Sequence, residues 1–179
     1  MLSNSQIETN KNILDFLGKT KISTPEDLIV LRNKIFSHLE FRPYNDETKA
    51  HADSIQWKRT ASEIIRDKYV YQGKACSDLT IIFLALCKAT GIEGRLVKLK
   101  AIDKQKTHSI AEINLNNKWY TFDISSKTSI PIQGELNENS IYQTQNKTSY
   151  KVWKKGRDVW GLKLEDISAE NKIFNQKDV

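Results

Sequence analysis

A cysteine that opens an apolar helix, a histidine in a later strand and an aspartate that closes the next strand could together form a nucleophilic site. The cysteine is Cys76, in the stretch YQGKACSDLTIIFLALCKATG, and the other two residues are His108 and Asp123. A free thiol has a pKa of about 8.5, and both a helix N-terminus and a neighbouring protonated histidine lower it. The histidine could accept and return the thiol proton, while the aspartate could fix the ring tautomer and stabilise the charged ring. These residue types predict covalent catalysis by a cysteine, provided that the fold brings them together.

Three strands must position the histidine and the aspartate. After the helix the apolar residues alternate over residues 95–102, 107–115 and 118–124, which predicts β-strands. Asn116 and Asn117 separate the last two strands, and asparagine tolerates the positive φ that a two-residue hairpin turn requires. The sequence therefore predicts an antiparallel hairpin with these two residues at its tip.

The hairpin register gives a geometric test of the site. If Leu115 faces Lys118, directly opposed residues have numbers that sum to 233, and Ile110 then faces Asp123. His108 would lie on the same face as Asp123, as its diagonal neighbour. Diagonal neighbours are about 7–8 Å apart, which an imidazole and a carboxylate can span with a hydrogen bond. A register shifted by one residue would place the two side chains on opposite faces.

The first half of the chain is predicted to be helical. A short apolar cluster at residues 13–17 favours a short helix, and Thr24 followed by Pro25 is typical of a helix start. Thr60–Glu63 reads TASE, a capping box that opens another helix, whereas residues 44–58 show no clear pattern. Helices followed by an antiparallel sheet predict an α+β fold in which the N-terminal helices pack on the sheet.

Length and composition favour one soluble domain over residues 1–179. The chain has 179 residues, of which 39% are hydrophobic and 28% charged, enough to bury a core. Its start shows no basic and apolar leader, and its longest apolar run is too short to cross a bilayer. We therefore expect a cytoplasmic protein without a membrane partner.

The net charge of +6 raises the alternative of nucleic-acid binding through a basic tail. The tail YKVWKKGRDVW, residues 150–160, interleaves aromatic and basic residues and could add a strand followed by a short helix. However, the charges are scattered along the whole chain, whereas a nucleic-acid site gathers them on one face. Solvated surface is the favoured interpretation of this tail.

The two cysteines are not expected to form a disulfide or a metal site. Cys76 and Cys87 would lie three turns apart on one helix, a rise of roughly 16 Å, whereas a disulfide needs Cα atoms within about 7 Å. We expect Cys87 to be buried and inert. The three histidines, His38, His51 and His108, show no ligand spacing with either cysteine, so neither a metal nor a cofactor is expected.

The order of these motifs resembles the transglutaminase-like superfamily, a branch of the papain-like cysteine hydrolases. A cysteine opening an apolar helix is followed by Ala-x-Gly-Ile-x-x-Arg, a histidine strand and Lys-Trp-Tyr-x-x-Asp. The residues that carry this match are Gly91, Ile92, Arg95, Lys118, Trp119 and Tyr120. The resemblance implies a transglutaminase-like core at about residues 57–125, between a helical part, 1–56, and a C-terminal extension, 126–179. It also implies that Cys76, His108 and Asp123 are nucleophile, base and orienting residue.

The implied activity is acyl transfer or hydrolysis at an amide bond of a protein or peptide, through a thioester. Peptidase, deamidase and transglutaminase reactions all use this chemistry, and a catalytically silent scaffold on the same fold is the alternative. The backbone N–H of Cys76 would be the first oxyanion donor, and Gln72 and Trp57 are candidates for the second. Glu112 shares the His108 face but lies farther along the strand, so Asp123 is preferred as the orienting group.

Overall fold

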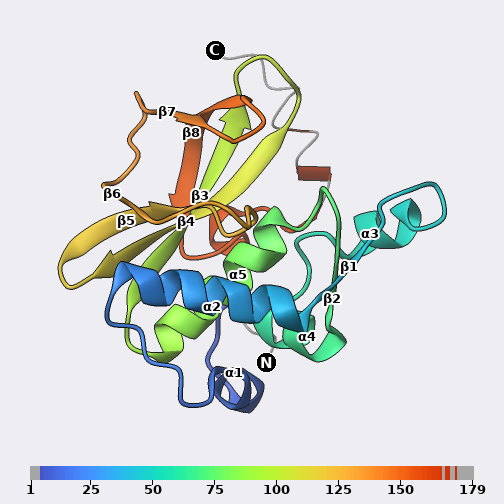
Figure 1. Ribbon diagram of the computed structural model, residues 1–179. Helices are drawn as coiled ribbons and strands as arrows, with labels where there is room; N and C mark the ends of the chain where they lie inside the picture. The colour runs from blue at the N-terminus through green and yellow to red at the C-terminus, as the bar shows by residue number, and fades with distance from the viewer. Residues whose placement is uncertain (1–4, 167, 170–171, 173–179) are drawn as a thin grey trace.

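The computed structural model describes residues 5–166, 168–169 and 172, and it consists of a helical half packed on a curled antiparallel sheet (Figure 1). This arrangement confirms the predicted α+β class. The helices are α1 (Lys11–Leu17), α2 (Pro25–His38), α3 (Lys49–Ile55), α4 (Ala61–Asp67) and α5 (Cys76–Ala89), with a 3₁₀ turn at Trp160–Leu162. The strands are β1 (Glu40–Arg42), β2 (Tyr69–Tyr71), β3 (Glu93–Ala101), β4 (Thr107–Leu115), β5 (Lys118–Phe122), β6 (Ile132–Gln133), β7 (Ile141–Gln143) and β8 (Ser149–Gly156).

Side-chain caps fix the starts of α2 and α4, as the sequence predicts. Thr24 precedes α2 and forms a capping box with Asp27, while Pro25 occupies the first turn. Thr60 forms the equivalent box with Glu63 at the start of α4. Each box satisfies two backbone N–H groups that the helix itself leaves unpaired. These two helix starts are therefore encoded locally and need no tertiary contact.

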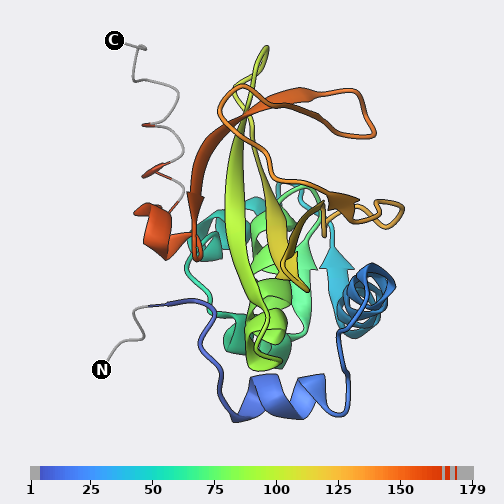
Figure 2. The same ribbon diagram turned by 90° about the vertical axis from the view of Figure 1, so that its left-hand side faces the viewer.

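Helix α5 forms the centre of the core. It lies behind α2 in Figure 1, and in the turned view of Figure 2 it lies behind the upright strands, with α1 below them and α2 at the right. All but a few of its residues are buried, because it packs on other helices and on the sheet. Cys87 is completely buried in this core and, like Cys76, is a free thiol. None of the helices in the described part of the chain combines the length and apolarity needed to cross a membrane.

The β4–β5 hairpin has the predicted register. Leu115 pairs with Lys118 and Ala111 with Phe122, and both asparagines of the turn have positive φ values, 54° for Asn116 and 61° for Asn117. The six strands of the main sheet follow the order β6-β5-β4-β3-β8-β7, and each neighbouring pair is antiparallel. Strands β3 and β4 therefore lie at the middle of the sheet, and most of their residues are buried.

Two parts of the fold differ from the sequence-based expectations. The region without a clear pattern contains α3, and β1 before it pairs in parallel with β2, a short strand that hydrophobic periodicity does not reveal. The basic tail forms the strand that its sequence allowed, but it is not merely solvated surface, because β8 pairs with β3 inside the sheet and Tyr150 is 1% exposed. Strand pairing with β3, rather than the charges of the tail, decides where this segment lies.

Candidate active site

Cys76 is the first residue of α5, at a helix N-terminus that carries no side-chain cap. The preceding residue, Ala75, occupies the cap position and cannot accept a hydrogen bond through its methyl group. The first backbone N–H groups of a helix have no partner within it and carry a partial positive charge. Cys76 is partly exposed and lines a surface cavity.

His108 and Asp123 are hydrogen-bonded as the hairpin register predicts. The Nε2 atom of His108 lies 2.8 Å from Oδ2 of Asp123. The other carboxylate oxygen accepts hydrogen bonds from the backbone N–H of Ser125 at 3.0 Å and from its hydroxyl at 2.7 Å. Tyr142 donates its hydroxyl to Oδ2 at 3.4 Å. Both oxygens of Asp123 are thus occupied, which fixes the carboxylate against the ring.

The thiol and the imidazole lie together and shift each other's pKa. Burial raises the pKa of Cys76, but the hydrogen bond and positive charge of His108, together with the charge of Lys98, bring that pKa down to about 7. Burial lowers the pKa of His108, whereas its hydrogen bonds to Asp123 and Cys76 raise that pKa to about 9. Because Nε2 of His108 is hydrogen-bonded to Asp123, the hydrogen bond between His108 and the Cys76 thiol involves the other ring nitrogen, Nδ1. Between these pH values the pair is a thiolate and an imidazolium.

Helix α2 holds the loop that carries Asp123. Arg32 is buried and donates from Nη1 to the carbonyl oxygens of Ser126 and Ser129, at 2.9 and 2.7 Å. Ser129 in turn donates its hydroxyl to the carbonyl oxygen of Asp123. The guanidinium also lies over the ring of Phe122, the last residue of β5. The first half of the chain therefore orients the residue that orients His108.

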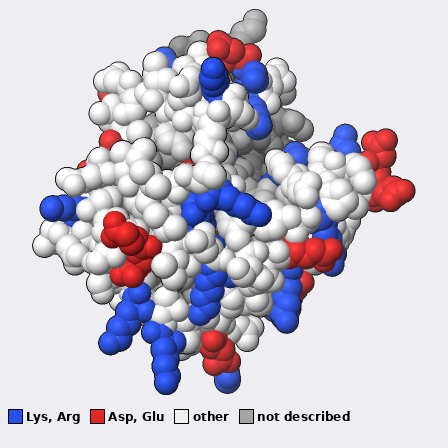
Figure 3. Space-filling model, viewed as in Figure 1, with Lys and Arg blue, Asp and Glu red and all other residues white. Residues whose placement is uncertain are grey.

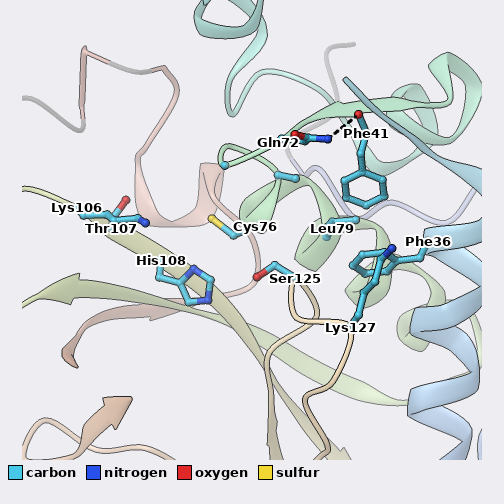
Figure 4. A pocket seen from close by; sticks show the side chains of 12 residues that line it. Phe36, Phe41, Gln72, Cys76, Leu79, Lys106, Thr107, His108, Ser125 and Lys127 are labelled. Atoms are coloured by element: carbon cyan, nitrogen blue, oxygen red, sulfur yellow. Dashed lines mark hydrogen bonds between the residues drawn. The ribbon is translucent and has the colours of Figure 1, made fainter. Parts of the chain in front are cut away.

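A cavity of about 520 Å³ opens in front of Cys76 and His108. Figure 4 shows the sulfur and the imidazole on one side of it and the rings of Phe36 and Phe41 on the other. Lys127 lies over the Phe36 ring, 5.5 Å from its centroid. The cavity thus offers an apolar wall opposite the thiol.

Charge around this opening is mainly positive. Lys106 and Lys127 line the cavity, and none of the described residues that line it is acidic. Figure 3 shows basic side chains bordering the hollow on the same face. The opening therefore presents both apolar and cationic groups.

The two candidate oxyanion donors have different positions. Gln72 lines the cavity beside Cys76 and donates from Nε2 to the carbonyl oxygen of Phe41 at 3.2 Å (Figure 4). Gly73 follows it with a φ of 74°, a left-handed conformation that favours glycine and turns the chain toward the helix. Trp57 is 1% exposed and donates its indole N–H to the hydroxyl of Ser77 at 3.1 Å. Its N–H is therefore directed into the core, whereas the side chain of Gln72 lines the cavity.

Glu112 has a structural role and does not contact His108. Its fully buried carboxylate accepts hydrogen bonds from Arg95 at 2.7 Å, from Lys155 at 2.8 Å and from the backbone N–H of Leu136 at 2.7 Å. Arg157 of the same basic tail lies 3.3 Å from the buried carboxylate of Asp158. Two cations of the tail are therefore engaged within the protein, which weakens the case for nucleic-acid binding.

Sequence reasoning missed a buried polar cluster beneath the site. It comprises Lys98, Ser77 and Ser109, with Trp57 at its side. The only sequence signal is position, since Ser77 directly follows Cys76 and Ser109 directly follows His108. Within the described residues there is no group of three or more His, Cys, Asp or Glu side chains that could hold a metal ion.

The sequence profile of the transglutaminase-like superfamily matches residues 19–124, more than half of the chain. The chain therefore belongs to this superfamily, and its fold is papain-like. Members of the superfamily are generally cysteine-based enzymes. A search of curated proteins finds no match.

Solved structures of similar fold share little sequence with this chain. The arylamine N-acetyltransferase (BACCR)NAT3 of Bacillus cereus, described with a Cys-His-Glu catalytic triad, is 14% identical with a TM-score of 0.51, and the match covers 96% of this chain and 78% of that one. LapG of Legionella pneumophila is 15% identical, with a TM-score of 0.49 and coverages of 92% and 80%. A structure named as a TGase is 12% identical, with a TM-score of 0.47 and coverages of 78% and 38%. The chain spans half or less of the length of two of the solved structures that it matches.

Proposed function

We propose that the protein catalyses acyl transfer or hydrolysis at an amide bond of a protein or peptide through a thioester on Cys76. The observation that carries this proposal is the continuous contact from Asp123 through His108 to a thiol at an uncapped helix N-terminus, facing a cavity. The lowered pKa of Cys76 and the raised pKa of His108 favour the reactive ion pair near neutral pH.

In the first half of the reaction the Cys76 thiolate attacks the carbonyl carbon of the amide. Negative charge forms on the carbonyl oxygen, where the backbone N–H of Cys76 and the side chain of Gln72 are the candidate donors. The C–N bond then breaks as His108 passes its Nδ1 proton to the leaving nitrogen. The products are a free amine or ammonia and an acyl group bound to the sulfur.

In the second half a nucleophile attacks the thioester carbonyl while His108 takes its proton. Water releases a carboxylic acid, which is hydrolysis, whereas a primary amine forms a new amide, which is transfer. The C–S bond breaks, and the proton returns the pair to its starting state. Asp123 stays ionised throughout and stabilises the imidazolium.

The test supplies glutamine-containing peptides with and without a labelled primary amine. Ammonia release alone would identify a deamidase, amine incorporation a transglutaminase, and shorter peptides a peptidase. Cys76→Ser keeps the shape of the side chain but replaces the thiol by a poor nucleophile, and it should lose whichever activity the wild type shows. A Cys76→Ser variant as active as the wild type would refute the proposal.

A further inference from the structure

Lys98 is a lysine in the interior of the protein. Lys98 lies on the central strand β3 and is 1% exposed. Its Nζ atom lies 3.1 Å from the hydroxyl oxygen of Ser109 and 3.4 Å from that of Ser77. The ammonium also lies 4.4 Å from the centroid of the Trp57 ring, which provides a cation–π contact. Placing an ammonium in the interior costs free energy, and these contacts offset part of that cost.

The cluster around Lys98 touches both sides of the active site. Ser77 is the residue after Cys76 on α5, and Ser109 is the residue after His108 on β4. Lys98 pairs with Ser109 in the β3–β4 register, and the Ser77 and Ser109 hydroxyl oxygens are 2.9 Å apart. One buried cation therefore braces the backbone positions next to the nucleophile and next to the base.

The electrostatic effect of Lys98 reaches the sulfur. Its positive charge lowers the pKa of Cys76, in addition to the larger effect of His108, and the backbone N–H of Ser109 also stabilises the thiolate. Burial raises the pKa of Tyr150 on β8, and the negative charges of Cys76 and Asp123 raise it further. The titratable groups that face Cys76 are Lys98 on β3, His108 on β4, Asp123 after β5, Tyr150 on β8, and Lys106 and Lys127 at the cavity.

We propose that Lys98 is a positioning residue of this active site, whose buried ammonium stabilises the negative charge on Cys76 and holds Ser77 and Ser109 in register. This proposal rests on the proposed function in one respect, that Cys76 is the nucleophile. The ammonium is shielded from solvent, so its charge acts on the thiolate whether or not a substrate is bound. It also explains why a strand of the core carries a lysine at a site where an apolar residue would pack well.

The test is the pH dependence of Cys76 alkylation by iodoacetamide, followed by peptide mass mapping. The wild-type rate should rise with a midpoint of about 7. Lys98→Met keeps the length of the side chain and removes the charge, and the midpoint should rise by roughly one pH unit, a tenfold smaller thiolate fraction below it. Lys98→Arg keeps the charge, so its midpoint should stay close to that of the wild type. A Lys98→Met midpoint equal to that of the wild type would overturn the proposal.

Two controls separate charge from structure. Lys88→Met removes one lysine charge at the exposed far end of the same helix and should leave the midpoint unchanged. If Lys98→Met does not fold by circular dichroism, Lys98→Gln, which keeps a donor for the serines without the charge, takes its place and should show the same shift. A shifted midpoint without turnover of any amide would uphold this proposal and reject the proposed function. Amide turnover with an unshifted midpoint would do the reverse.

Discussion

Replacing Asp123 by asparagine tests whether its carboxylate sets the protonation of the other two residues. Ser125 donates two hydrogen bonds to Oδ1, so the amide oxygen of the new side chain must take that position. The amide NH₂ group then faces Nε2 of His108, which can only accept from it. The neutral ring must therefore carry its proton on Nδ1, the nitrogen that faces Cys76, and it can no longer receive the thiol proton.

The size of the effect follows from the contact that is lost. A hydrogen bond to a charged group contributes about 1.5–3 kcal/mol, which is roughly a 10- to 150-fold change in the population of the thiolate–imidazolium pair. At pH 6, below the pKa of about 7 for Cys76, the alkylation rate of Asp123→Asn should fall by this factor relative to the wild type. The midpoint of its pH profile should move upward by roughly one to two units.

The matched control is Asp103→Asn, which removes an exposed carboxylate from the loop before β4. This variant should alkylate at the wild-type rate. If Asp123→Asn also reacts at the wild-type rate with an unchanged midpoint, then the carboxylate does not set the state of the pair and the reasoning is wrong.

Three further outcomes are expected. Activity should rise through pH 7 as Cys76 ionises and fall through pH 9 as His108 loses its proton, in a bell whose limbs belong to the coupled pair; a steady rise to pH 10 would contradict this. The double variant Cys76→Ser, His108→Ala should be little slower in amide turnover than either single variant, since residues of one unit give non-additive losses; multiplying losses would mean separate roles. Glu112→Ala should lower the free energy of unfolding in urea by about 1–3 kcal/mol because the partly exposed Arg95 and Lys155 lose their hydrogen bonds to its buried carboxylate, whereas Lys154→Met at the exposed surface should change it by less than about 0.5 kcal/mol.

The local signals of the sequence determine the positions of His108 and Asp123 well. The Asn116–Asn117 turn fixes the hairpin register without any knowledge of the rest of the chain, and the register places the two residues on one face. The helix that begins at Cys76 is predicted by the apolar spacing after it, although no side chain caps its start. These features depend on residues that are close in sequence, where turn and helix preferences are strong.

The remaining features depend on contacts between distant segments. Alternation in β3 suggests that Lys98 faces solvent, but α5 covers that face and the lysine is buried. Lys155 similarly reads as surface charge until β8 pairs beside β3 and brings it to Glu112. Charge and periodicity within one segment do not reveal which segment will cover it, so such residues can be assigned only from the fold.

Mass spectrometry of the intact protein during turnover tests the central claim most directly. An amide peptide mixed with the wild-type protein and quenched in acid should add the mass of its acyl group, and peptide mapping should place that group on Cys76. Treatment with hydroxylamine should remove it, as expected for a thioester, and Cys76→Ser should carry none. An active wild-type protein that never carries the acyl group, or that carries it on another residue, would contradict the account.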